Sequence, residues 1–264
     1  MSGSTIAEDE KPPIDINTLT VEEKKDLVSA DTISVLSSTT LDASSPTFTP
    51  VKSLHINAKG TPVLCLPVPP AELITAIHNP DGSLAYTSTR AKRSSGSCVL
   101  TDAEGTALIG TEYFFGPGKD PKLIRLDDVP EGTTAADSQE IKTASNWTSR
   151  NHRFLLPDGH TFAWSYKKEK GFGANGFKGT ALVLTLGEKR VALLIRNDET
   201  RTPGSKSCSA GNGGELVLGS DVGGEVGIDE DLVVATVLLM LKKEVDRRRT
   251  VQFMMIASAV SGGS

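Results

Sequence analysis

Residues 229–249, DEDLVVATVLLMLKKEVDRRR, decide the fold. The three leading acids provide an N-cap and an acidic first turn, and the closing cations suit the negative end of a helix dipole. Residues 232–241 are apolar on every face, so a helix at about residues 229–247 needs apolar neighbours all round. Such a helix is roughly 28 Å long, but its apolar part falls short of the ~20 residues that cross a bilayer. We therefore predict a central core helix and no transmembrane span.

Short apolar runs separated by turn residues occupy the chain from Val51 onward and predict successive β-strands. Turn signals at residues 79–82, 102–105, 157–159 and 187–189 join several of them as hairpins. The expected strands are VKSLHI, TPVLCLP, ELITAIHN, SLAYTSTR, GSCVLTD, TALIGTEYFF, KLIRL, HRFLL, HTFAWSY, ALVLTL, RVALLI, GELVLG and, after the helix, VQFMMIA.

The absence of long helices between these strands favours antiparallel pairing and a mainly β fold. An antiparallel closed β-barrel of about a dozen strands would place apolar walls around the C-terminal helix. We expect a barrel domain at residues 51–257 and a flexible C-terminus at residues 258–264. Residues 1–50 carry 3 Lys and 9 Asp or Glu with several prolines. This composition predicts a disordered acidic tail, with a short helix at residues 20–35.

Composition narrows the classes of function. The formal charge of −5 comes from the acidic tail, because the remainder is nearly neutral, so bulk nucleic-acid binding is not expected. Cys65, Cys98 and Cys208 are widely spaced and lack histidines at ligand spacing, which predicts neither disulfides nor a metal site. The N-terminus lacks a secretory pattern. We expect a cytoplasmic protein, with the nucleus as an alternative, and no cofactor.

Several strings carry resemblances to known proteins. The β-rich body followed by the hydrophobic helix, the strands around Trp164 and the hairpin leading to VALLIR resemble the tubby C-terminal and LURP-one-like group over about residues 51–256. This resemblance implies a barrel around a central helix. The strings TEYFFGPGKDP, WTSRNHRF, ETRTPGSKSCSAGNGGEL and KKEVDRRRTVQFMMI resemble uncharacterised proteins of filamentous fungi. No tubby signature peptide is present, so the lipid-headgroup binding of that family transfers to no residue here.

A cationic loop after the predicted strand RVALLI is the first candidate anion site. It combines cations, hydroxyls and glycine backbone N–H groups, which suit phosphate or carboxylate. The alternative is a solvated loop in which its arginines pair with Asp198 and Glu199. The candidate ligand-binding residues are Arg196, Arg201, Ser205 and Lys206.

A second candidate site lies at the end of the predicted helix, where Lys242, Lys243 and Arg247 could contact an anionic lipid headgroup. The alternative is structural: the cations complement the helix dipole, and Glu244 pairs with Arg248 at i,i+4 spacing. Residues 90–93, RAKR, are interpreted as a charged strand end.

No motif assigns catalysis. GFGANG at residues 171–176 fits a nucleotide-loop spacing but lacks a following helix, and His160 beside Asp158 lies in a predicted turn. We therefore favour a non-catalytic binding module of tubby or LURP-one-like type, whose target is an anionic ligand, either a lipid headgroup or phosphate, or a partner protein. The alternative is an enzyme or small-molecule carrier with a pocket at the barrel mouth.

Overall fold

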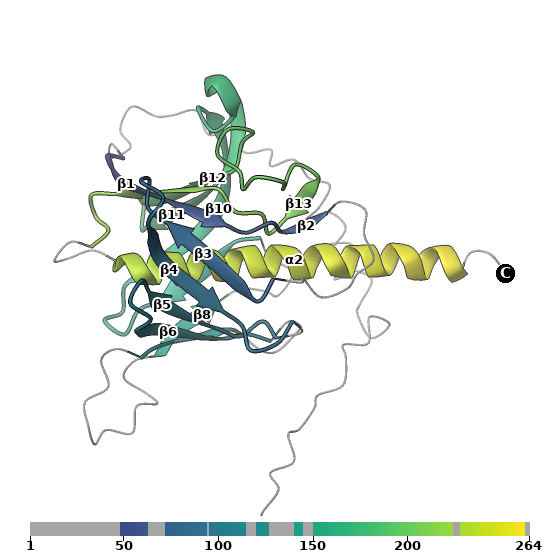
Figure 1. The fold of residues 1–264 in the computed structure, drawn as a ribbon, viewed down its shortest axis with the longest axis horizontal. Helices are drawn as coiled ribbons and strands as arrows, with labels where there is room; N and C mark the ends of the chain where they lie inside the picture. The colour runs from purple at the N-terminus through teal and green to yellow at the C-terminus, as the bar shows by residue number, and fades with distance from the viewer. Residues whose placement is uncertain are drawn as a thin grey trace, which may run out of the picture.

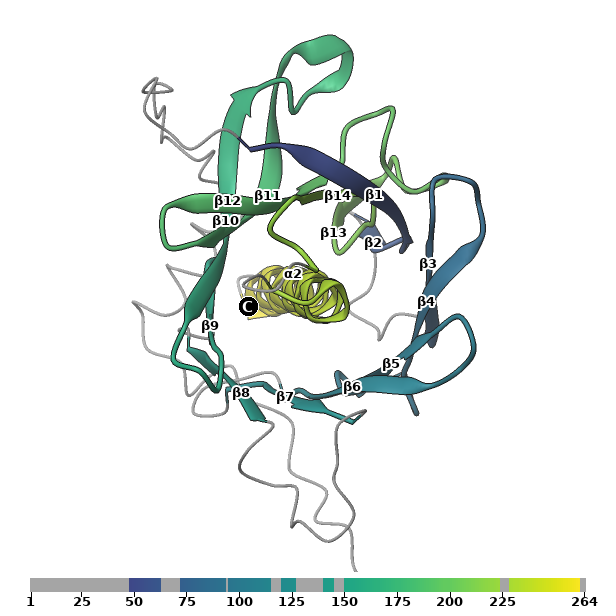
Figure 2. The same cartoon turned by 90° about the vertical axis from the view of Figure 1, so that its left-hand side faces the viewer.

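The computed structural model describes residues 48–62, 72–93, 95–114, 120–126, 140–144, 150–223 and 228–261. Within these residues, twelve antiparallel strands form a closed barrel, and the helix α2 (Glu230–Ser261) runs through it. Figure 2 looks along the helix and shows the strands as a ring around it. The predicted fold class of an antiparallel closed barrel around a hydrophobic C-terminal helix is confirmed. The predicted tail lies outside the described residues as far as position 47, and Pro50 already begins the first strand.

The barrel is closed by the first strand, β1, which pairs with β14 on one side and with β3 on the other. The order around the ring is β1, β14, β12, β11, β10, β9, β8, β7, β6, β5, β4, β3. The bounds are β1 Pro50–Asn57, β3 Ile74–His78, β4 Leu84–Thr89, β5 Cys98–Asp102, β6 Ala107–Glu112, β7 Lys122–Arg125, β8 Glu140–Ala144, β9 His152–Leu155, β10 Thr161–Lys170, β11 Lys178–Leu186, β12 Lys189–Ile195 and β14 Glu215–Gly219.

The four predicted hairpin turns join β3 to β4, β5 to β6, β9 to β10 and β11 to β12, as expected. In the third turn, Gly159 has φ +87°, and its N–H donates to the carbonyl of Leu156 at 3.0 Å. This left-handed conformation explains the glycine at that position.

Two features of the sheet differ from the expected strands. β8 was absent from the prediction because its sequence EIKTA has only one large apolar residue, although Ile141 and Thr143 alternate inward. The expected strand TPVLCLP contributes only the short β2 (Thr61–Pro62), and its continuation lies outside the described residues. β2 pairs with β13 (Cys208–Ala210), which lies within the loop predicted after β12.

The helix is longer than predicted. The expected final strand VQFMMIA is wrong, because these residues continue α2, as do residues 258–261. No Gly or Pro interrupts positions 230–261, and extending an existing helix costs far less than starting a new element. Most of α2 is buried as far as Gln252, whereas Phe253, Met255 and Ile256 are exposed where the helix projects from the barrel (Figure 1). We call this the exit end.

None of the helical segments in the described part of the chain is long and apolar enough to cross a membrane. The core instead fills the space between the inner barrel wall and the apolar half of α2, where Val233, Val234 and Val237 are fully buried. One hydrogen bond joins wall and helix inside this core: the indole N–H of Trp164 on β10 donates to Thr236 Oγ1 at 2.9 Å. A buried indole N–H requires such a partner.

The acidic start of α2 fixes the helix at the opposite end of the barrel. Arg125 on β7 forms ion pairs with Asp229 and Asp231. Lys52 on β1 binds Glu230 at 2.7 Å. The acids predicted as a helix N-terminus therefore also attach the helix to strands on different sides of the ring.

Candidate anion-binding site

The middle segment of α2 is polar yet buried, just before the exit end. Lys243, Glu244, Asp246 and Arg247 are each no more than 6% exposed. Burying charged groups is costly unless partners compensate them. The partners of each side chain therefore decide what this segment does.

Glu244 is compensated by three donors from the barrel side. Arg196 binds both of its carboxylate oxygens at 2.7 and 2.9 Å, and the Tyr166 hydroxyl donates to it as well. The N–H of Gly211 donates at 2.8 Å; this residue has φ +71°, and a Cβ there would lie 2.2 Å from Val245. Burial alone would raise the pKa of Glu244, but Arg196 and the other donors hold it at about 2. Glu244 and Arg196 form a structural pair.

Lys242 and Asp246 form a second compensated pair, with 2.8 Å between Nζ and Oδ1. Arg249 approaches the same carboxylate oxygen at 3.4 Å. Lys242 also lies over the ring of Tyr113, 5.8 Å from its centre. The charge of Lys242 is thus balanced within the helix.

Lys243 lies in a different environment, 2.8 Å from Nδ1 of the buried His152 on β9. Burial and, to a smaller extent, the positive charge of Arg247 lower the pKa of Lys243 to about 8, while Asp120 opposes the shift. Burial and the Lys243 charge lower the pKa of His152 to about 3. At neutral pH the imidazole is therefore neutral and can accept a hydrogen bond from the ammonium group.

Arg247 differs from Lys242 and Glu244, because no partner for its charge lies among the described residues. It is 4% exposed, and neither an ion pair nor a side-chain hydrogen bond joins it to any residue that the structure describes, with its Nε buried and unpartnered. Its charge opposes the rise in pKa that burial imposes on Tyr113 and Tyr166. Arg150 lies over the ring of Tyr166, with its guanidinium carbon 4.9 Å from the ring centre. We call Arg150, Lys243 and Arg247 the cation cluster.

The candidate residues of the cationic loop have different partners. Arg196 is drawn into the pair with Glu244 and does not pair with Asp198 or Glu199, whereas Arg201 pairs with Asp198 at 3.1 Å as the alternative expected. Ser205 is buried, and its hydroxyl donates to the carbonyl of Thr202 at 2.6 Å. The remaining candidate of the loop, Lys206, is exposed.

The other motifs have structural places. GFGANG forms the β10–β11 connection, with the short 3-10 helix η2 (Ala174–Gly176) leading directly into a strand. His160 Nδ1 lies 2.9 Å from Asp158 Oδ2, and both side chains are exposed at the tip of the β9–β10 hairpin. Within the described residues, no group of three or more His, Cys, Asp or Glu side chains could hold a metal ion.

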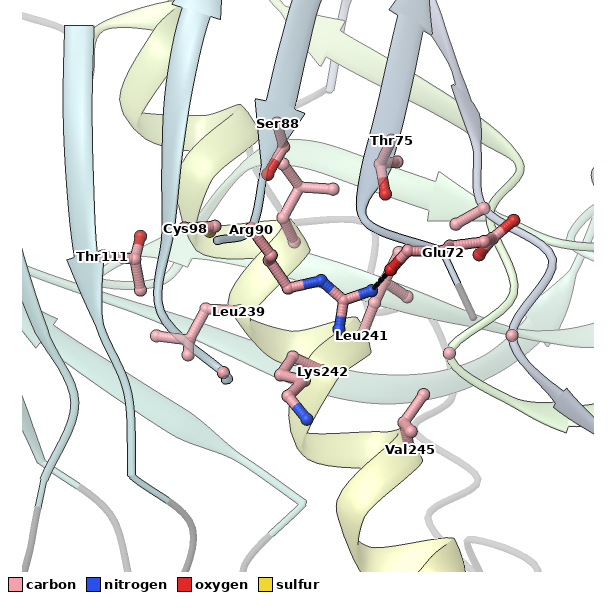
Figure 3. A pocket seen from close by; sticks show the side chains of 15 residues that line it. Glu72, Thr75, Ser88, Arg90, Cys98, Thr111, Leu239, Leu241, Lys242 and Val245 are labelled. Atoms are coloured by element: carbon pink, nitrogen blue, oxygen red, sulfur yellow. Dashed lines mark hydrogen bonds between the residues drawn. The ribbon is translucent and has the colours of Figure 1, made fainter. Parts of the chain in front are cut away.

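A separate cavity of about 70 Å³ lies between α2 and strands β3 to β6 (Figure 3). Arg90, at the end of β4, donates to the carbonyl of Glu72, while its Nη1 is buried and has no hydrogen-bond partner among the described residues. The hydroxyls of Thr75, Ser88 and Thr111 line the strand side. The helix side is lined by Leu238, Leu239, Leu241, Lys242 and Val245.

No family model and no curated protein matches this chain. A solved structure of an Arabidopsis thaliana protein is similar over 73% of this chain and 91% of that chain, with 11% sequence identity and a TM-score of 0.38. This similarity is too low to assign a family.

The sequence does not indicate two residues of these sites. Arg150 at the exit end belongs to no motif, and Arg90 at the separate cavity belongs to the RAKR run interpreted as a charged strand end. The pair of Glu244 with Arg196, 48 positions away, was not indicated by the sequence. Lys243 and Arg247 were candidates, and their i,i+4 spacing was a signal that they share one helix face.

Proposed function

We propose that the chain is a non-catalytic binding module for an anionic ligand, and that a phosphate group of this ligand binds at the cation cluster. The observation that supports it most is Arg247, a buried guanidinium without a partner among the described residues. An isolated buried charge is strongly unfavourable, and a bound anion would remove this cost. Guanidinium groups bind phosphate through paired hydrogen bonds.

The neighbours of Arg247 suit a phosphate group more than a single carboxylate. Lys243 adds a second buried cation, and Arg150 is partly exposed beside Tyr166, so an anion entering from the exit end would meet Arg150 first. Because the pKa of Lys243 is about 8 in the unoccupied protein, the ammonium form predominates at pH 7. Phosphate affinity should fall as the pH rises through 8.

Binding of inorganic phosphate, measured by calorimetry on the full chain, tests this proposal. Arg247→Met should weaken binding about tenfold or more, since hydrogen bonds to charged groups are each worth ~1.5–3 kcal/mol. Arg153→Met is the matched control, because Arg153 is exposed on the outer face of β9. Equal phosphate affinity of Arg247→Met and the wild type, or no binding of any phosphate probe, would contradict the proposal.

A vesicle arm distinguishes a lipid headgroup from a soluble phosphate compound. It is included because exposed Phe253, Met255 and Ile256 follow the cluster on the same helix. Sedimentation with phosphatidylcholine–phosphatidylserine vesicles, but not with phosphatidylcholine alone, together with loss of binding in Arg247→Met, would identify a headgroup. Phosphate binding without vesicle binding would identify a soluble ligand. A partner protein and a cytoplasmic location stay predictions of the sequence.

A further inference from the structure

The cavity between α2 and strands β3 to β6 shares no lining residue with the cation cluster: Arg150, Lys243 and Arg247 do not line it. We propose that this cavity is a binding site for a small monocarboxylate with a short alkyl chain. The proposal goes beyond the phosphate site and assigns the chain a second ligand.

The charge at the cavity favours a monoanion. Arg90 is the lining cation that lacks a carboxylate partner among the described residues, since Lys242 pairs with Asp246. The Glu72 carboxylate accepts from the N–H of Lys59 at 3.2 and 3.3 Å, and among the described residues the Arg90 guanidinium donates only to the Glu72 carbonyl. One guanidinium with a free Nη1 matches one carboxylate.

The hydroxyls of the strand side supply the remaining polar contacts. Ser88 and Thr111 are each 6% exposed, and neither hydroxyl is hydrogen-bonded to another residue of the described chain. Figure 3 shows Ser88 and Thr75 on neighbouring strands above Arg90. These donors can bind the second carboxylate oxygen while Arg90 binds the first.

The size and the helix side of the cavity limit the rest of the ligand. Its volume of about 70 Å³ is about half that of an engineered apolar cavity of ~150 Å³ that holds benzene. Leu238, Leu239 and Val245 form an apolar surface opposite the hydroxyls. The cavity is not fully enclosed, so it can hold the carboxylate and the first carbon atoms of a short chain whose end extends outward, and butyrate is a suitable probe.

The free thiol of Cys98 lines the same cavity and reports its occupancy. Alkylation of Cys98 by iodoacetamide, followed by mass spectrometry of its peptide, should slow as butyrate is added. Butyramide, the neutral analogue of similar shape, should protect at least about tenfold less well, because it lacks the charge that Arg90 compensates. Cys208, which lies outside the cavity, is the internal control.

Two variants test the residues. Arg90→Gln should weaken butyrate binding about tenfold or more, and Arg153→Gln should leave it unchanged. Since Arg90 also holds the Glu72 carbonyl, Ser88→Val is a second variant that narrows the cavity without removing a charge, and it should also abolish protection. Equal protection by butyrate and butyramide, no protection of the wild type, or full protection in Ser88→Val would overturn the proposal.

The experiments can refute either proposed site without affecting the other. Arg90→Gln should retain phosphate affinity, and Arg247→Met should retain protection of Cys98 by butyrate. If phosphate instead protects Cys98 better than butyrate does, the cavity is a phosphate site and the monocarboxylate proposal is wrong.

Discussion

Arg196 and Arg247 are both largely buried at the exit end, but different groups face them. Arg196 binds both oxygens of Glu244, whereas Arg247 faces no acid to which it is paired in the described chain. Removing one partner of a buried ion pair leaves an uncompensated charge, while removing an unpaired charge relieves one. The same substitution should therefore have opposite effects at the two positions.

Arg196→Met should lower the free energy of unfolding by about 3–5 kcal/mol, and Arg247→Met should raise it by about 1–4 kcal/mol. Urea denaturation in phosphate-free buffer measures both values. Addition of phosphate should stabilise the wild type and not Arg247→Met. A destabilised Arg247→Met variant would mean that Arg247 supports the fold instead of a ligand.

Glu244 predicts an acid-dependent loss of stability. Its pKa is lowered in the folded chain from an ordinary 4.5 to about 2, so its contribution is complete above pH 4.5 and is lost as the pH falls toward 2. The shift corresponds to about 3 kcal/mol. Unfolding free energies measured between pH 2 and 6 should show this decline in the wild type. Glu244→Gln should be less stable at every pH, and its unfolding free energy should decline less as the pH falls. Parallel profiles would assign the acid sensitivity to other carboxylates.

At the scale of the element, α2 changes its environment twice along its length. An apolar half packs inside the barrel, a polar segment lies at the exit end, and a third segment projects from it. Val237 is fully buried in the first segment, whereas Ile256 is 44% exposed in the last. These two β-branched residues provide a matched pair on one helix.

Val237→Asp should prevent soluble folding, because its carboxylate would have no partner in the core. Ile256→Asp should remain folded, with a stability within about 0.5 kcal/mol of the wild type. Gel filtration and circular dichroism of both variants, expressed without detergent, test the buried helix. A monodisperse, folded Val237→Asp protein would contradict the central position of α2.

At the scale of the whole molecule, the barrel also has an apolar patch on its outer face. Ala181 and Val183 on β11 and Leu193 on β12 are buried there, and Phe48 packs against them from the N-terminal side. The described chain therefore begins at a residue that covers part of the barrel. What precedes it was predicted to be a disordered tail.

Removal of residues 1–47 should leave stability nearly unchanged, whereas Phe48→Ala should lower it by about 1–2 kcal/mol through loss of apolar burial. Limited proteolysis should show cleavage before Phe48 and a resistant core after it. Thermal denaturation of the shortened chain and of Phe48→Ala measures the two stabilities. A tail as resistant as the barrel would contradict the predicted disorder.

The sequence determined the parts of this protein that depend on local pattern. Capping acids, an all-round apolar run and glycine turns specify the helix start and the hairpins, because neighbours along the chain suffice to select them. The strand β8 and the partners of the charges were decided only by tertiary structure. Closure of the barrel brings Arg196 to Glu244 and leaves Arg247 without a partner in the described chain. The candidate site could be predicted only in part, because compensation of a buried charge depends on groups that are distant in sequence.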